Sequence, residues 1–180
     1  MRAFIAVLGL LLLIPAARAV DSMSIELGTS NSSNTSVDMT RIGVQWNWSK
    51  RWAITQNWHI GGYWDLGFGY WANDSARKTN NGLTDLSFTP VFRLQQTSMS
   101  AISPYLEAAI GFHLLSDSSV TEQRRFSTTF QFGDHLGLGF RFGHRHAMDL
   151  GYRYQHLSNA GIKHPNHGIN FHQVRFQYHF

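Results

Sequence analysis

Apolar and polar side chains alternate with a period of two along most of the chain, which predicts β-strands. In segment 41–48 every even position is apolar and every odd position is polar or small. The same alternation recurs in segments 59–70, 85–94, 105–114, 131–142, 147–156 and 170–180, and more weakly near 22–30. We therefore expect an all-β fold with about eight strands, each of about ten residues.

The two sides of these strands differ in a way that indicates a membrane barrel. One side collects Trp, Phe, Tyr and Leu, and the other carries the charges of Glu26, Asp65, Asp85, Arg93, Glu107 and Arg141. A soluble barrel of the lipocalin kind would turn its apolar side inward, whereas a one-sided aromatic band suits a lipid-facing surface. The charges would then pair inside a narrow lumen. We predict an eight-stranded antiparallel transmembrane β-barrel, and the terminal Phe180 resembles the closing signature of bacterial outer-membrane proteins.

The first residues have the features of a secretory signal peptide. A positive start at Arg2 is followed by an apolar run from Ala3 to Ile14 and by Ala17-Arg18-Ala19, a small-x-small cleavage site. The alternative, an uncleaved anchor, is disfavoured because the apolar run is too short to span a membrane. We predict cleavage after Ala19, with residues 1–19 as the signal peptide and 20–180 as the barrel.

Composition supports an exported membrane protein and argues against disulfide-bonded, thiolate-metal and nucleic-acid-binding proteins. Aromatic and charged residues each make up 14% of the chain, against about 25% charged residues in a typical globular domain. There is no cysteine, so disulfides and thiolate metal sites are ruled out. The net charge is +4, and Arg2 and Arg18 of the signal peptide supply two of these charges. A charge so small and scattered does not indicate nucleic-acid binding.

The connections between the predicted strands alternate in length. Short ones lie near 49–51, 95–102 and 143–144, and longer ones, rich in Ser, Asn and Thr, near 31–39, 72–83, 115–129 and 157–168. In outer-membrane barrels the short turns face the periplasm and the long loops face outward. The end of the seventh strand, the fourth outer loop and the start of the eighth strand therefore meet at the outer rim.

A candidate catalytic pair lies at this rim. His156 and Ser158 are two residues apart on the apolar side of their strand, which is within reach for an imidazole to activate a serine. Such a pair suits a substrate that is itself a lipid lying against the barrel. The base needs an orienting group, and because no Asp or Glu follows Asp149, Asn170 on the neighbouring strand takes that place.

The same loop offers donors for an oxyanion. Asn159 follows the serine directly, and Asn166 and the amide of Gly161 are further candidates. Gly161 and Gly168 permit unusual backbone angles. On spacing alone a His-x-Ser pair is more often structural than catalytic, so the residues by themselves leave a non-enzymatic barrel open.

The run His156-Leu157-Ser158-Asn159-Ala160-Gly161, followed by Pro165-Asn166-His167-Gly168, resembles the signature of the lipid A 3-O-deacylases of the PagL type. The specific motif covers residues 156–170, and the rest of the chain is similar in plan. The resemblance implies an outer-membrane serine esterase that removes the acyl chain at position 3 of lipid A without a metal or other cofactor. It implies His156 as base, Ser158 as nucleophile and Asn159 in the oxyanion hole.

The chain departs from this pattern at one position. The family's acid, usually Glu, falls two residues after the last Gly of the motif, where this chain has Asn170. We expect retained activity, because the Ser-His pair and the oxyanion donors are intact. The alternatives are a non-catalytic or latent small barrel, favoured by Asn170, and a phospholipase or acyltransferase barrel.

Partners follow from the same residues. Lys163, Arg153 and Arg175 lie in the C-terminal region and could meet lipid A phosphates, although Arg153 and Arg175 share the inward side of their strands. The scattered His164, His167, His172 and His179 do not form a convincing metal site. A homodimer is left open by the sequence.

Overall fold

The computed structural model describes residues 19–32 and 34–180. Its strands are β1 (Ser22–Ser32), β2 (Thr35–Asn47), β3 (Trp52–Ala53), β4 (Trp58–Asn73), β5 (Gly82–Gln96), β6 (Ile102–Leu115), β7 (Phe130–Phe142), β8 (Met148–Ser158) and β9 (Ile169–His179), with one 3-10 turn, η1 (His144–His146). In this part of the chain no helix is long and apolar enough to cross a membrane. The predicted signal peptide falls on residues outside the described ones, apart from Ala19.

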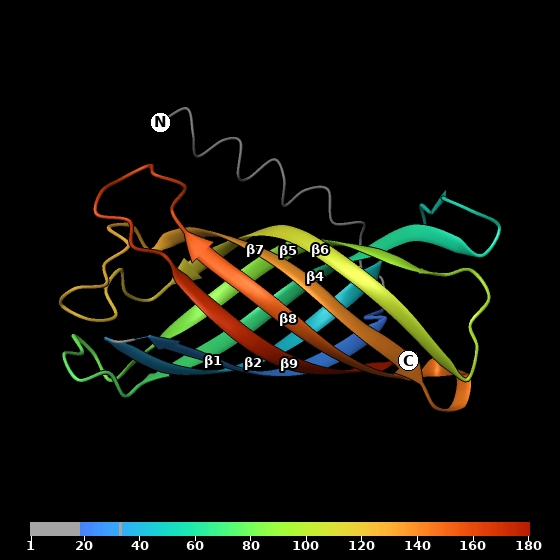
Figure 1. Ribbon diagram of the computed structural model, residues 1–180, viewed down its shortest axis with the longest axis horizontal. Helices are drawn as coiled ribbons and strands as arrows, with labels where there is room; N and C mark the ends of the chain where they lie inside the picture. Colours follow the sequence, from blue (N-terminus) through green and yellow to red (C-terminus); the bar gives the residue numbers. More distant parts are fainter. Residues whose placement is uncertain (1–18, 33) are drawn as a thin grey trace.

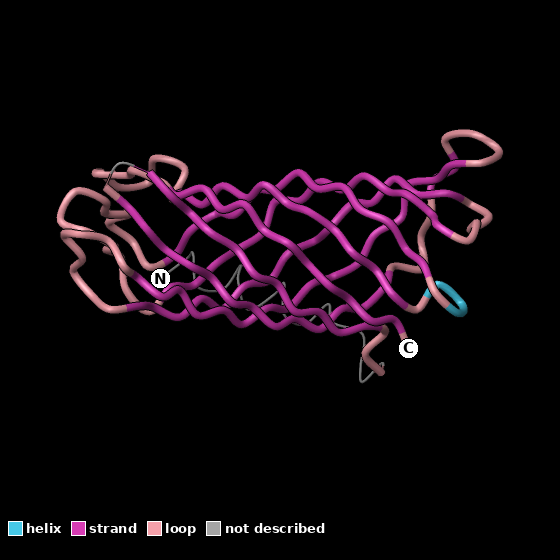
Figure 2. Tube along the Cα trace, turned by 60° about the horizontal axis from the view of Figure 1, so that its bottom comes forward, coloured by secondary structure: helices cyan, strands magenta, loops and turns pink. Residues whose placement is uncertain are grey.

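The strands close into a barrel (Figures 1 and 2). Each long strand pairs antiparallel with the next one along the chain, and β1 pairs with β9 to close the ring. The two-residue β3 only extends the edge of β4, and β2 pairs directly with β4. The ring therefore has eight strands, and the predicted eight-stranded antiparallel barrel is confirmed. Antiparallel closure leaves no free sheet edge, which satisfies the backbone of every strand.

The alternation of the sequence becomes an inside and an outside. Large apolar side chains such as Ile110, Leu136 and Leu138 are more than half exposed on the outer wall, at 67%, 70% and 56%. Charged side chains of the intervening positions, among them Glu26, Asp85, Arg153 and Arg175, are buried in the lumen. This orientation is the one expected of a wall in contact with lipid, and it is the reverse of a lipocalin.

The lumen is filled by a network of ion pairs. Arg153 donates from Nε to Glu107 at 2.6 Å and from Nη1 to Glu26 at 2.9 Å. Arg93 pairs with Glu107 at 2.8 Å and with Asp149 at 2.7 Å. The predicted pairing of lumen charges is thus confirmed for most of them, including Asp65 and Asp85. Arg141 is the exception, because it donates to the carbonyl of His146 at the barrel end instead of to a carboxylate.

The two ends of the barrel differ. The loop end carries the connection between β1 and β2 and the connections 74–81, 116–129 and 159–168, and the turn end carries 48–57 with β3, 97–101, 143–147 and the C-terminus (Figure 1). Under the loops an apolar plug fills the lumen, made of Val37, Met39, Trp71, Leu83, Leu115, Val120, Phe126, Leu157, Ile169 and Phe171. The plug fills this end of the barrel with side chains.

One predicted loop is wrong. The sequence near 31–39 was expected to form a long connection, but β1 and β2 stay in register up to the pair Ser32 and Thr35. The reason is that Val37 and Met39 belong to the apolar plug, which keeps this polar-looking stretch in the sheet. The other predicted long loops are confirmed, and the strands extend up to six residues beyond the predicted segments, most at the start of β2.

Candidate active site on the outer wall

The predicted catalytic residues meet where β8 ends and β9 begins, at the loop end. His156 and Ser158 are both half-buried on the outward face of β8, and Asn170 is exposed on the same face of β9. The sheet register places His156 directly opposite Asn170. The structure therefore pairs His156 with Asn170 across the two strands and places Ser158 on the same outward face, two residues further along β8.

The His156 imidazole is oriented by Asn170. Its Nδ1 lies 2.5 Å from Asn170 Oδ1. Because an amide oxygen can only accept, the ring proton resides on Nδ1 and Nε2 keeps its lone pair. That tautomer is the one a general base for serine requires.

Gly168 makes room for the same imidazole. A Cβ atom at this position would lie 2.7 Å from His156 Cε1 and 3.3 Å from Nε2. The residue also has a φ of +57°, which L side chains rarely adopt. Both the backbone conformation and the packed ring therefore require glycine here.

The backbone after Ser158 turns sharply and offers a donor to the nucleophile. Ala160 and Gly161 have φ angles of +53° and +78°. The N–H of Ala160 points to Ser158 Oγ at 3.4 Å. A positive φ at a non-glycine residue stores strain, which is commonly found at functional sites.

Asn159 and Asn166 shape this turn. Asn159 is fully buried, and its Nδ2 donates to the carbonyl oxygens of Phe126 at 2.6 Å and Lys163 at 2.7 Å, while its Oδ1 accepts the N–H of Gly161 at 2.9 Å. Asn166 Oδ1 accepts the backbone N–H of Asn159 at 3.1 Å. The Asn159 side chain thus points away from the serine, and the N–H of Ala160 is the donor that faces Ser158.

The neighbouring loop 116–129 braces the site loop 159–168. Arg124 donates from Nη1 to the carbonyl of Gly168 and from Nε to Thr35 Oγ1 at 2.8 Å. Ser127 Oγ donates to the Pro165 carbonyl at 2.8 Å, and the N–H of Arg125 donates to His167 Nδ1 at 3.2 Å. Burial lowers the pKa of Arg124 from its usual value. Figure 1 shows the two loops at the same end of the barrel.

Sequence analysis did not identify Asp134, which the fold brings to this site. Asp134 lies on β7, directly opposite His156 in the sheet register, and is exposed on the same outward face. In the sequence, Asp134 interrupts the alternation of apolar and polar residues. It is a carboxylate at a position between Phe132 and Leu136 where the pattern predicts an apolar side chain. Nothing in the linear spacing connects it to His156, which is 22 residues away.

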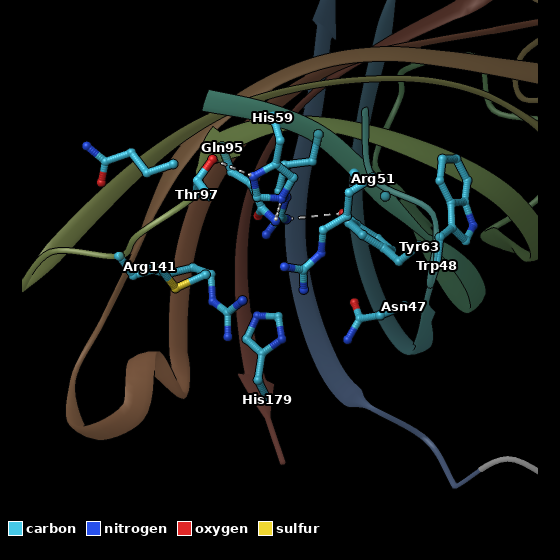
Figure 3. A pocket seen from close by; sticks show the side chains of 14 residues that line it. Asn47, Trp48, Arg51, His59, Tyr63, Gln95, Thr97, Arg141 and His179 are labelled. Atoms are coloured by element: carbon cyan, nitrogen blue, oxygen red, sulfur yellow. Dashed lines mark hydrogen bonds between the residues drawn. The ribbon is translucent and has the colours of Figure 1, made fainter. Parts of the chain in front are cut away.

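The barrel also has a pocket, but at the turn end. It is lined by polar side chains that include Arg51, His59, Arg141 and His179 (Figure 3). The Ser-His pair is at the opposite end and on the outer wall, so this pocket is not part of the candidate active site. Across the described chain no group of three or more His, Asp or Glu side chains could hold a metal ion.

Comparison with known proteins shows which family the chain belongs to. The profile of the family described as "Lipid A 3-O-deacylase (PagL)" matches residues 38–179. The chain belongs to this family. The match spans the candidate catalytic residues and all of the barrel from β4 onward.

Two PagL relatives and one solved PagL structure show how far the similarity extends. The lipid A deacylase PagL of Pseudomonas aeruginosa is 33% identical over 91% of this chain and 88% of its own length. That of Bordetella bronchiseptica is 37% identical over 67% of each chain. The crystal structure of the outer membrane enzyme PagL superposes with a TM-score of 0.75 at 31% identity, covering 88% of this chain and 99% of that one.

Proposed function

We propose that Ser158, activated by His156, carries out the lipid A 3-O-deacylation of the PagL family in this chain. The chain is an ester hydrolase of this family with the barrel of an outer-membrane enzyme. The observation that supports these residue roles is the hydrogen bond of 2.5 Å from His156 to Asn170. His156 is two residues before Ser158 on the same strand. The hydrogen bond leaves Nε2 of the neutral ring available as the base that we propose takes the proton of Ser158.

The position of the pair suits a substrate that stays in the membrane. Exposed apolar side chains cover the wall below the site, including Tyr154, Tyr152 and Val174 at 42%, 39% and 55% exposure. Acyl chains of lipid A can lie along this wall while the sugar head reaches the loop end. With the long loops outward, Ser158 would be at the level of the outer leaflet. An ester carbonyl at the boundary between sugar and acyl chain would then meet Ser158.

The proposed reaction has two steps. Ser158 Oγ attacks the ester carbonyl while its proton passes to His156 Nε2, and the oxyanion receives the N–H of Ala160, the nearest backbone donor. His156 then gives the proton to the leaving sugar oxygen, and an acyl-serine remains. Water activated by His156 attacks the acyl-serine, which frees a fatty acid and restores Ser158.

The structure limits which cations can meet the lipid A phosphates. Lys163 is exposed in the site loop, whereas Arg153 and Arg175 are buried in the lumen with exposures of 2% and 0%. We therefore propose Lys163 as a phosphate contact and assign the two arginines to the lumen network.

The test is mass spectrometry of lipid A from cells that express this chain with its leader. We expect the loss of one 3-hydroxyacyl mass, absent with Ser158→Ala and with His156→Ala. The intact mass of the barrel purified from the same cells gives the start of the mature protein, which we propose to be Val20. Unchanged lipid A from a correctly inserted barrel would favour the latent-barrel alternative, and loss of phospholipid or gain of an acyl chain would favour a different lipid enzyme.

A further inference from the structure

Asp134 is an unusual residue for the place it occupies. The charged side chains of the described strands point into the lumen, except those of Asp38 and Asp134, which are exposed on the outward face. Asp134 is four residues inside β7, at the level of His156. A carboxylate on a lipid-facing wall costs free energy that grows with depth, and of these two only Asp134 lies beside the proposed catalytic base, which makes it the candidate for a role in the reaction.

The register puts His156 between two polar side chains in one row. Asn170 on β9 is its partner on one side, and Asp134 on β7 is its partner on the other. Residues directly opposite on one face of an antiparallel pair have Cβ atoms about 4.5–5.5 Å apart. The Asp134 carboxylate is therefore close enough to act on the imidazole electrostatically, while Nδ1 is already held by Asn170.

An acid beside a catalytic histidine both orients the ring and supplies a negative charge, and Asn170 can do only the first. Its neutral Oδ1 fixes the ring and its tautomer. When His156 takes the serine proton, however, the ring becomes a cation, and an amide dipole compensates that charge less than a carboxylate does. The usual acid of the family supplies orientation and charge from one residue.

We infer that in this chain the two roles are divided: Asn170 orients His156, and Asp134 supplies the negative charge that stabilises its protonated form. This inference rests on the proposed function. Asp134 stays ionised throughout, and the only proton that moves passes between Ser158, His156 and the sugar or water oxygen. Asp134 acts through His156 and is a positioning residue. Its charge acts strongly because the surrounding lipid and apolar side chains have a low dielectric constant.

The decisive experiment compares Asp134→Asn in two backgrounds, with purified, refolded full-length mature barrel and lipid A in mixed micelles. In the parent chain we expect kcat to fall by about 10- to 100-fold while KM changes less than about threefold, because the charge acts only after the proton has moved. In an Asn170→Glu background, where a carboxylate already contacts His156, the same substitution should cost less than about threefold. Asp134→Glu in the parent chain should retain most of the activity.

Two controls separate this role from other effects. Asp38→Asn removes the other outward-facing strand carboxylate, three strands from His156, and should leave kcat unchanged. Heat-modifiability on gels reports the folded fraction, so that rates refer to folded barrel. Full activity of Asp134→Asn in the parent chain, an equal loss in both backgrounds, or a loss confined to KM would overturn the inference. Activity that survives Ser158→Ala would instead overturn the proposed function.

Discussion

His156 on β8 and Asn170 on β9 face each other across the strand pair, with Nδ1 of the imidazole 2.5 Å from Oδ1 of the amide. This contact orients a base on the outward face of a barrel. The site is built from the ends of two paired strands and the loop 159–168 that joins them. Rigid strands can hold such a site more precisely than a loop alone.

The first prediction concerns Asn170 itself. Replacing it with Ala removes the acceptor from Nδ1, so the ring is free to rotate and to adopt the wrong tautomer. We expect kcat to fall by about 10- to 100-fold, which is less than the roughly 10⁴-fold lost when the carboxylate of other triads is replaced, because Asn170 supplies orientation but no charge. Asn170→Asp should keep the activity at or above the parent level. Kinetics on lipid A with the two variants check this, and an Asn170→Ala enzyme as fast as the parent would show that the contact is dispensable.

Gly168 gives a second prediction. Gly168→Ala places a methyl group 2.7 Å from His156 Cε1 and must displace the ring from its position beside Asn170. We expect a loss of activity of at least about tenfold, since small displacements of a catalytic group are costly.

The matched control for this substitution is Gly143→Ala. Gly143 also has a positive φ, of +79°, but lies at the turn end against Met148. It should therefore share the backbone strain and keep the activity. If both variants lose activity equally, strain and not ring displacement is the cause.

Arg124 gives a third prediction, about the brace between the two loops. Arg124→Ala removes the hydrogen bonds to the carbonyl of Gly168 and to Thr35. We expect the site loop to become more mobile, with faster hydrogen exchange of residues 159–168 and a severalfold lower kcat. Arg125→Ala is the control, because it removes the same charge from an exposed neighbour whose contact with His167 is made by the backbone N–H. Equal effects of both variants would indicate a role of loop charge instead of the brace.

The lumen network gives a fourth prediction, on stability. Glu107 accepts hydrogen bonds from Arg93, Arg153 and Tyr63 at 2.8, 2.6 and 3.0 Å. Glu107→Gln leaves two buried guanidinium groups with less negative charge, and breaking such pairs typically costs about 3–5 kcal/mol.

Urea-induced unfolding in lipid vesicles measures this loss. Thr89→Val, at a buried uncharged lumen position, is the isosteric control and should change the free energy of unfolding far less. A Glu107→Gln barrel as stable as the control would mean that the lumen charges rearrange without cost.

The sequence predicted some of these features because they are local. Period-two alternation fixes which side chains share a face, and it located every long strand, although the first polar connection was mistaken for a loop. The His-x-Ser pair was visible for the same reason, since two residues on one strand keep their spacing in any fold. Asn170 could be found because its strand follows directly in the chain.

Only the tertiary structure decided how residues from distant segments combine. The burial of Val37 and Met39 in the apolar plug depends on Phe126 and Phe171, far along the chain. The buried position of the Asn159 side chain depends on a carbonyl acceptor from the loop 116–129. Asp134 lies opposite His156 only because β7 and β8 pair in one particular register, and a shift of one residue would turn its side chain to the other face. Alternation determines faces, but cross-strand register is set by turns and lumen packing, and it is the register that assembles this site.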